Sequence, residues 1–499
     1  MPLFPSPMSP GSSPLPEPGR RPPDSRAMRL GMLVALPALI VALLAGPVGL
    51  PQLWSLVGGF QAQTSGGLQN KATAQFQGFI FSWSASQKGG GYNTPASLQN
   101  MRSQASLFHM NAVIIPVIAD MPNRSAATLL WQAGQKADVD TLQESEYEQA
   151  IKDARAAGLV PVLELQVRQY DRLSAGDTSA YWVGKVWANT RGEDNFPSLG
   201  GTVNQIEKSW FNNYTAFAAT YARLSAKYNL PYFIIGDGLS NVTTDGPLTT
   251  AKADPASIDR GVPGESFPTC SGRRDCEWRH VIHAIHAPEY ATFIQHTAQQ
   301  GGDYSGKLIY AASWRGAPQG ATSPEFENIT WWDAVDMIGV DAYFPLSQNN
   351  ADLSTSQLQN AWEGQVPCGD KDLNICPGDI VARLSAVSAK YGRPLVFTAA
   401  GYGSTPGANS GPPIPPSANL ANRDDSEQLS DMQALLETFN GQPWWAGVFW
   451  NGDEPIAPRS SQPGWATSSN WAGDTLATSK AAGQWLATYY KSNPLPCSC

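Results

Sequence analysis

Short β-rich runs alternate with longer amphipathic segments from about residue 76 onward, and this alternation constrains the fold more than any other feature. Parallel strands joined by crossover helices produce this order. The eight predicted strands are residues 76–83, 112–119, 159–167, 232–239, 307–314, 335–344, 394–402 and 446–451. Helical patterns lie at residues 144–157, 210–228, 287–300, 380–391, 426–439 and 479–490. Eight strands alternating with helical segments favour a closed sheet over an open one.

The expected fold class is therefore α/β, a single (β/α)8 TIM barrel with long loops at its C-terminal face. A chain of 499 residues with 42% hydrophobic content can form such a barrel without a second domain. No phosphate-binding GxGxxG motif follows the first predicted strand, which removes the main reason to prefer an open nucleotide-binding sheet. Two long loops are predicted, residues 241–278 after the fourth strand and 403–424 after the seventh.

The N-terminal region has the pattern of a membrane or signal segment. Residues 1–29 are rich in Pro and Ser and are expected to be disordered, and residues 58–71 form a polar linker. Between them, residues 30–57 contain 21 uncharged residues from Leu30 to Leu50, preceded by Arg26 and Arg29. We expect a signal anchor that holds the barrel, residues 72–499, at the cell surface. Cleavage as a signal peptide, near Ala42 and Ala45, remains open and would give a secreted protein.

Six cysteines fall in three close pairs, which is typical of an oxidising compartment. The pairs are Cys270 with Cys276, Cys368 with Cys376, and Cys497 with Cys499. The first two are expected to close small loops, whereas the third pair is too close in sequence to bridge comfortably. Other connectivities remain open.

Charge and metal-ligand patterns exclude several partners. The net charge of −9 and the absence of a long basic run argue against nucleic acid. His280, His283 and His286 are spaced by three, but apolar residues interleave with them and no nearby carboxylate completes a ligand set. No metal and no cofactor is therefore expected.

The sixth predicted strand carries the most specific motif. Residues 331–346 read WWDAVDMIGVDAYFPL, and residues 307–314 read KLIYAASW. Together with residues 210–214 (WFNNY), Trp278-Arg279 and Gly401-Tyr402, they resemble glycoside hydrolase family 113, in the same order along the chain. The resemblance implies a clan A barrel of the retaining β-mannanase type.

Such a barrel requires two carboxylates, a nucleophile and an acid/base, about 5–5.5 Å apart. The resemblance implies that they follow the fourth and seventh strands, within Ile-Gly-Asn-Glu-Leu-Ser and Phe-Thr-Glu-Ile-Gly-Tyr. This chain reads IGDGLS at residues 235–240 and FTAAGY at residues 397–402, so Gly238 and Ala399 occupy the two positions. Neither side chain can donate a proton or form a glycosyl ester, and no catalytic residue is assigned.

Seven residues at strand ends are nevertheless expected to contact a ligand: Trp83, Asp237, Trp314, Asp341, Tyr343, Trp450 and Asp453. The aromatic rings can stack on sugar faces, and the acids can accept bonds from hydroxyl groups. Asp237 lies next to the lost acid/base position. Because neighbouring strand residues point to opposite faces, it is not expected to project where that glutamate would.

The leading hypothesis is a surface-displayed barrel that binds a polysaccharide, β-mannan-like or from a cell wall, without hydrolysing it. Its partners would be the polysaccharide or an oligosaccharide, and a membrane through the N-terminal segment. One alternative is an active glycoside hydrolase with relocated carboxylates, which would be inverting if they stood about 6.5–9.5 Å apart. Another is a structural or protein-binding surface domain.

Overall fold

The computed structural model describes twelve segments of the chain: residues 76–81, 91–122, 126–132, 142–169, 202–244, 274–292, 297–315, 324–347, 352–365, 378–410, 424–451 and 480–495. All of them belong to the second of two compact units, Asn70–Cys499. None of the helices in these segments combines the length and apolar character needed to cross a membrane. The predicted anchor, residues 30–57, lies outside the described residues.

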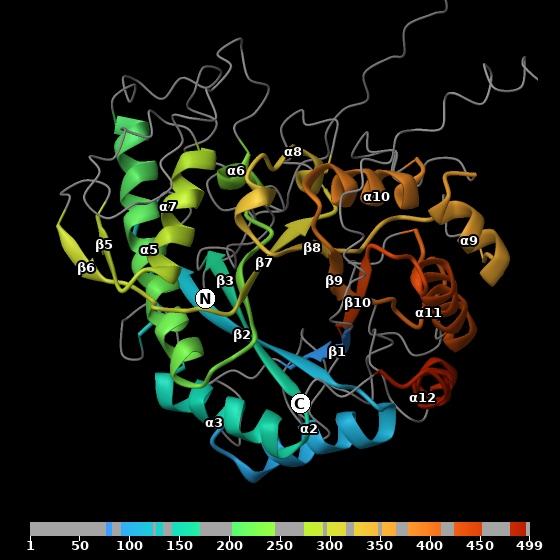
Figure 1. The fold of residues 1–499 in the computed structure, drawn as a ribbon. Coiled ribbons are helices and arrows are strands. Elements are labelled where there is room, and N and C mark those ends of the chain that lie inside the picture. The colour runs from blue at the N-terminus through green and yellow to red at the C-terminus, as the bar shows by residue number, and fades with distance from the viewer. Residues whose placement is uncertain are drawn as a thin grey trace, which may run out of the picture. The chain divides into compact units, whose positions relative to one another are not determined.

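Eight parallel strands close into a barrel in the order β1-β10-β9-β8-β7-β4-β3-β2, which confirms the predicted (β/α)8 fold (Figure 1). The strands are β1 (Phe76–Ile80), β2 (Ala112–Met121), β3 (Val160–Gln169), β4 (Tyr232–Asp237), β7 (Lys307–Ser313), β8 (Met337–Asp341), β9 (Leu395–Ala400) and β10 (Trp445–Trp450). Each predicted strand corresponds to one of them, with ends that differ by a few residues.

Helices surround these strands in Figure 1. The longer ones are α2 (Pro95–Phe108), α3 (Glu144–Ala156), α5 (Thr202–Lys227), α7 (Arg274–His286), α9 (Thr355–Trp362), α10 (Ile380–Tyr391), α11 (Asp425–Phe439) and α12 (Ala481–Ser492). Shorter turns are α6 (Ser240–Thr243), α8 (Glu325–Asn328) and the 3-10 helix η8 (Trp332–Ala334).

One predicted helix is wrong. Residues 287–300 contain a two-stranded antiparallel hairpin, β5 (Glu289–Ala291) with β6 (Ala298–Gln300), and the helix of this region is α7, which ends at His286. Pro288 lies two residues after that end, and proline disfavours a helical conformation in the residue before it, here Ala287. The β-branched Thr292 and Thr297 then pair with each other across the hairpin.

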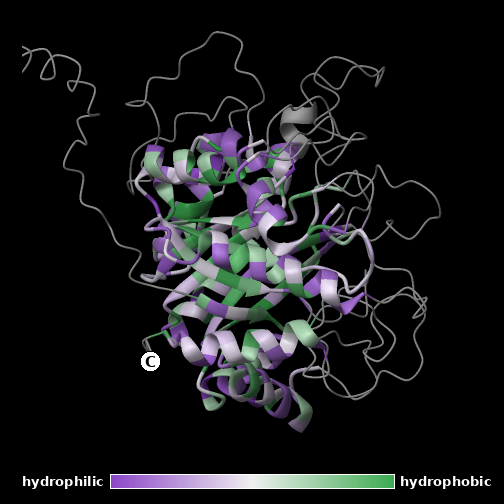
Figure 2. Cartoon of the chain, turned by 90° about the vertical axis from the view of Figure 1, so that its right-hand side faces the viewer, coloured by the Kyte–Doolittle hydropathy of each residue, from purple (hydrophilic) through white to green (hydrophobic). Residues whose placement is uncertain are grey.

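The core has two layers because strand side chains alternate between the two faces of the barrel wall. A small inner cluster takes residues from all eight strands and none from a helix, for example Ile114, Val162, Ile234 and Ile309. A much larger outer cluster joins the opposite strand faces to the helices. Figure 2 shows apolar residues concentrated on the strands, with polar residues frequent on the helices. Only a strand side chain on the inner face can therefore point into the barrel and reach its mouth.

Candidate functional site

The C-terminal ends of the strands form the mouth of the barrel, which is the end where ligand sites lie in this fold. Strand β3 sends Glu164, Gln166 and Arg168 toward the inner face, because they continue the alternation that begins with Val162. Arg168 makes a two-pronged ion pair with the fully buried Asp120 of β2, with nitrogen to oxygen distances of 2.9 and 3.3 Å. The charges of Arg168 and Asp120 therefore compensate each other. Glu164, the acid of β3, has no ion-pair partner among the described residues.

Strand β4 contains a bulge that turns Asp237 toward the inside of the barrel. Ile234 pairs with Ile309, but Asp237 pairs with Ala311, so three steps on β4 face two on β7. A bulge of this kind changes which face a following side chain occupies. Nε2 of Gln166 accordingly lies 3.1 Å from Oδ2 of Asp237. Asp237 therefore faces the inside of the barrel, where simple alternation along β4 from Ile234 would not have placed it.

Asp237 and Asp341 form a carboxyl pair across the mouth. Strand β7 lies between their strands and contributes only Ala311 and Ser313 beside them. These small side chains let the two carboxyl groups meet in a hydrogen bond. Thr398 donates a further bond of 2.9 Å to Oδ1 of Asp341. The sequence identified both acids as mouth residues but not their contact.

Glu164 is the acid that the sequence interpretation missed. It is 2% exposed, and its Oε2 accepts a bond of 2.8 Å from the same Gln166 amide that reaches Asp237. The sequence carried a signal for it, because Glu164 follows Val160 and Val162 on one face of a predicted strand, and glutamate is rarely buried unless it is paired.

Burial and like charge control the protonation of this cluster. Burial raises the pKa of Asp341 well above its usual range, and the charge of Asp237 raises it further. Burial, again with the charge of Asp237, raises the pKa of Glu164. Burial also raises the pKa of Asp237, although bonds from Asp341 and Gln166 favour its ionised form. Asp237 thus keeps its charge more readily than Asp341, and the protonated Asp341 donates a hydrogen bond to it.

The two positions that the family pattern assigns to catalytic glutamates lie at the same mouth. Gly238 follows Asp237 with a φ of +59°, and a Cβ built there meets no atom within 4 Å. Ala399 belongs to the inner cluster and pairs directly with Asp341. Both positions therefore open toward the mouth while lacking an acid.

Tyr343 is the predicted aromatic that reaches the mouth. It is partly exposed, contacts both core clusters, and its hydroxyl accepts a bond of 2.6 Å from Nδ2 of Asn451 at the end of β10. Trp83 and Asp453 lie outside the described residues.

Two predicted aromatics do not line the mouth. Trp450 is 1% exposed and points outward, where its indole N–H donates 2.8 Å to the hydroxyl of Tyr490 in α12. Its neighbour Phe449 takes the inner face instead, so alternation directs Trp450 away. Trp314 is 3% exposed, packed against Phe344 with the Arg315 guanidinium 4.5 Å from its ring centre. Neither ring has a face left for a sugar.

A buried carboxyl group behind the wall supports the end of β4. Glu325 is 1% exposed and accepts bonds from Thr243 (2.6 Å), Tyr310 (2.7 Å) and the Ser313 amide (2.8 Å). The Tyr310 hydroxyl in turn accepts 2.9 Å from the amide of Leu239, directly after Gly238. This network joins the segments after β4 and β7 and fixes the backbone on which Asp237 stands.

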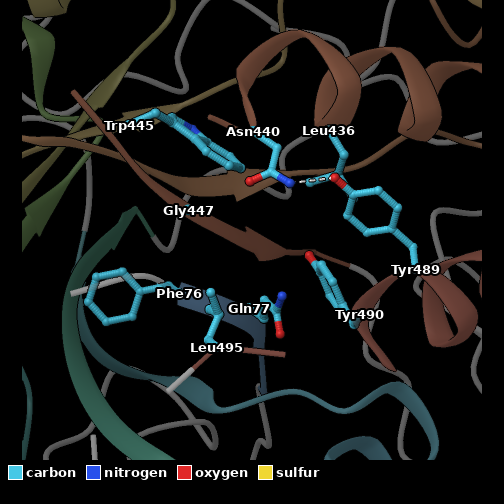
Figure 3. Close-up of a pocket in the computed structure, with 9 residues that line it drawn as sticks. All are labelled: Phe76, Gln77, Leu436, Asn440, Trp445, Gly447, Tyr489, Tyr490 and Leu495. Carbon is cyan, nitrogen blue, oxygen red and sulfur yellow. Dashed lines mark hydrogen bonds between the residues drawn. The ribbon is translucent and has the colours of Figure 1, made fainter. Parts of the chain in front are cut away.

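A pocket also exists at the opposite end of the barrel (Figure 3). It lies between the first residues of β1 and β10 and the helices α11 and α12, lined by Phe76, Trp445, Asn440 and Tyr489 among others. The Asn440 amide donates 2.6 Å to the Tyr489 hydroxyl. No acid lines this pocket, so it is separate from the carboxyl cluster in both place and chemistry. Within the described residues, no group of three or more His, Cys, Asp or Glu is arranged to hold a metal ion.

Comparisons with known proteins agree with the barrel fold. Residues 269–460, which include β7 to β10, match the model of Glycoside Hydrolase Family 113. The resemblance to family 113 is confirmed over that region. A comparison with curated protein sequences gave no match.

Solved structures of family 113 enzymes share the fold. Two structures of a family 113 β-1,4-mannanase, one of them a complex, each superpose with a TM-score of 0.54 at 18% identity, covering 84% of this chain and 99% of theirs. The family 113 β-mannanase AaManA from Alicyclobacillus acidocaldarius, in complex with ManMIm, gives 0.53 at 18% identity, covering 84% and 98%. The barrel fold of these structures thus extends over most of this chain, beyond the residues that match the family model.

Proposed function

We propose that this barrel binds a polysaccharide, β-mannan-like or from a cell wall, in its mouth and does not hydrolyse it. The observation that carries the proposal is the contact between Asp237 and Asp341. Retaining and inverting glycosidases need their carboxyl groups about 5–5.5 Å or 6.5–9.5 Å apart, which leaves room for the anomeric carbon or a water. A pair in direct hydrogen-bond contact leaves room for neither.

The two substituted positions support the same conclusion. Gly238 and Ala399 carry no ionisable group, and loss of general acid catalysis alone typically reduces rates by about 10² to 10⁴. Binding does not need those acids. Tyr343 offers an aromatic face, and Gln166, Asn451 and the carboxyl groups offer hydrogen bonds to hydroxyls. The β-mannanase structures of the same fold add weight to a glycan ligand.

We further propose that residues 30–57 anchor the barrel at the cell surface or, if cleaved, lead to its secretion. The uncharged stretch and the arginines before it support this placement. Fractionation of cells that express the full chain tests it. Recovery of the intact chain in the soluble cytosolic fraction would contradict the proposal.

Hydrolysis through relocated carboxylates is the second candidate. One observation favours it: burial raises the pKa of Glu164, as a general acid requires, and Glu164 shares the Gln166 amide with Asp237.

A screen for released reducing sugar on β-mannans, glucans and xylans separates the two candidates. We expect no release by the natural chain and retarded migration in gels that contain the bound polysaccharide. Release that disappears in Glu164→Gln or Asp237→Asn would overturn the binding-only proposal. Unretarded migration in every gel would instead favour a structural or protein-binding domain. The double substitution Gly238→Glu with Ala399→Glu tests whether the mouth can still hold a substrate productively, because any activity gained requires a bound glycan.

A further inference from the structure

The pocket at the N-terminal end of the barrel offers a second place for a ligand, away from the mouth. Its empty volume is about 290 Å³. Four aromatic residues and two amides make up most of its lining: Phe76, Trp445, Tyr489, Tyr490, Gln77 and Asn440 (Figure 3). We call it the base pocket. Asn440 is exposed and Tyr489 is partly exposed, so the rim of the pocket reaches solvent where α11 and α12 meet.

The base pocket contains a buried hydrogen-bond donor without an acceptor. Trp445 is 7% exposed, and among the described residues its indole N–H has no hydrogen-bond partner. Trp450, at the other end of the same strand, shows the usual arrangement, because its N–H donates to the Tyr490 hydroxyl. A buried donor left unpaired is costly and rare in a native fold. The N–H of Trp445 therefore points to a ligand group that accepts from it.

Two amide oxygens supply the opposite hydrogen-bonding function. The Asn440 amide donates 2.6 Å to the Tyr489 hydroxyl, and the Gln77 amide donates 2.8 Å to the carbonyl of Asn493. Both bonds use the amide nitrogen, and within the described part of the chain neither side-chain oxygen accepts a bond. The base pocket thus offers one donor and two acceptors, all of them neutral. A hydroxyl group matches them, because it can accept from an indole N–H and donate to an amide oxygen at once.

We propose that the base pocket is a second carbohydrate site, which takes one neutral sugar unit of a glycan. A sugar ring presents apolar C–H faces to the aromatic rings and hydroxyls to the polar groups. None of the described residues that line the pocket is charged, and burial of an unpaired charge is costly, so acidic and basic sugars fit poorly. A purely apolar ligand would leave the N–H of Trp445 unpaired.

The size of the pocket limits the ligand further. Its volume of about 290 Å³ is close to the lower limit of ligand pockets, which span about 300–1,000 Å³. The base pocket therefore suits a single sugar ring rather than several units of a chain.

The base pocket and the mouth lie at opposite ends of the barrel. Trp445 is the first residue of β10, whereas Asp237 and Asp341 are the last residues of β4 and β8. The base pocket is therefore a separate site from the one proposed above. Substitutions in the two places give separate tests.

Calorimetric titration of the intact chain with disaccharides tests the proposal. The probes are mannobiose and cellobiose, which are neutral, and digalacturonic acid, which is charged. Tyr343→Ala impairs the mouth, so binding that this variant retains is assigned to the base pocket. We expect Tyr343→Ala to bind at least one neutral probe and not the charged one.

A second substitution in that variant identifies the group that binds the sugar. Adding Trp445→Phe should weaken the retained binding about tenfold, because it removes the indole donor and leaves an aromatic ring in place. Thermal unfolding should change little, since the lost N–H has no partner among the described residues of the free protein. Trp362→Phe is the matched control. It removes an indole N–H that is also buried and unpaired among the described residues but lies in α9, and it should leave binding unchanged.

The outcomes separate the base pocket from the mouth. If the natural chain bound a neutral probe and Tyr343→Ala bound none, the base pocket would be overturned and the mouth would remain the glycan site. Retained binding that Trp445→Phe leaves unchanged would also overturn the base pocket. Equal binding by the natural chain and Tyr343→Ala, lost on adding Trp445→Phe, would support the base pocket and count against the mouth. No binding of any probe by either chain would count against both sites.

Discussion

The hydroxyl of Tyr310 lies between two groups that belong to different loops, 2.7 Å from Oε1 of Glu325 and 2.9 Å from the amide nitrogen of Leu239. It donates to the first and accepts from the second. Through this one hydroxyl, a carboxylate after β7 controls the position of the chain after β4.

Burial raises the pKa of Glu325 to about 7, against bonds from Thr243, Ser313 and Tyr310 that favour its ionised form. The folded-state pKa therefore exceeds the unfolded value, and the native chain binds the proton more tightly. The stability associated with that proton is complete below the unfolded pKa of 4.5 and is lost as pH rises through 7.

Glu325→Gln should remove this pH dependence because glutamine stays neutral. Between pH 5 and pH 8 the natural chain should lose on the order of 2–3 kcal/mol more unfolding free energy than the variant. Denaturant unfolding at both pH values measures the difference. Parallel behaviour of the two proteins would show that Glu325 does not titrate in the folded barrel.

Gly238 and Gly236 should respond to alanine for different reasons. At Gly238 the added Cβ meets nothing, so Gly238→Ala should cost only the left-handed backbone strain, about 1 kcal/mol. At Gly236 a Cβ would lie 2.8 Å from the Tyr214 hydroxyl and 2.9 Å from the Tyr310 ring. Gly236→Ala should therefore cost more, by overpacking of about 1–3 kcal/mol. The two unfolding free energies provide the check, and the reverse ranking would contradict the geometry.

Trp450 and Tyr343 should separate stability from ligand binding. Trp450→Phe leaves the Tyr490 hydroxyl without its indole donor in a buried layer, which should cost about 1–3 kcal/mol. Binding of a mouth ligand should remain unchanged. Tyr343→Ala should weaken that binding with a smaller loss of stability, because its side chain is partly exposed. Affinity electrophoresis measures ligand binding by the two variants, and thermal unfolding measures their stability. Weaker binding by Trp450→Phe would argue for a role of that ring in the cleft.

Asp341→Asn should stabilise the barrel at high pH. Burial raises the pKa of Asp341 in the folded state, so the natural chain loses stability as pH rises above the unfolded pKa. Asparagine carries no proton to lose and can still accept from Thr398. The unfolding temperature of the variant should exceed that of the natural chain at pH 8, and the gap should narrow at pH 5. A constant gap would mean that Asp341 is ionised throughout this range.

Local sequence pattern was sufficient to predict the barrel, because each parallel strand is an apolar run followed by a helical segment. It failed where tertiary structure overrides local periodicity. The hairpin β5–β6 stands where a helix was predicted, because Pro288 disfavours a helical conformation at Ala287, the first residue after α7. The orientations of Asp237 and Trp450 depend on register, which pairing with neighbouring strands sets.

The carboxyl cluster was only partly predictable for a related reason. Asp237 and Asp341 were recognised as mouth residues, but their contact depends on the small side chains of β7 between them. Glu164 lies outside the segments that carry the family resemblance, and its place in the cluster becomes clear only from the Gln166 amide that bonds to both Glu164 and Asp237.

Because of the extra residue in β4, a comparison of sequence positions and a trace of the backbone identify different residues at the mouth of the barrel. Compared with the family pattern by position, Gly238 stands where the acid/base glutamate is expected. The backbone of β4 instead places an acid, Asp237, on the inside of the barrel one residue before Gly238. In relatives of this protein, a bulge shifted by one residue in β4 would change which side chain faces the ligand, although the sequence of the strand stays the same. Surveys for inactive members of such families should therefore compare strand pairing before they count missing glutamates.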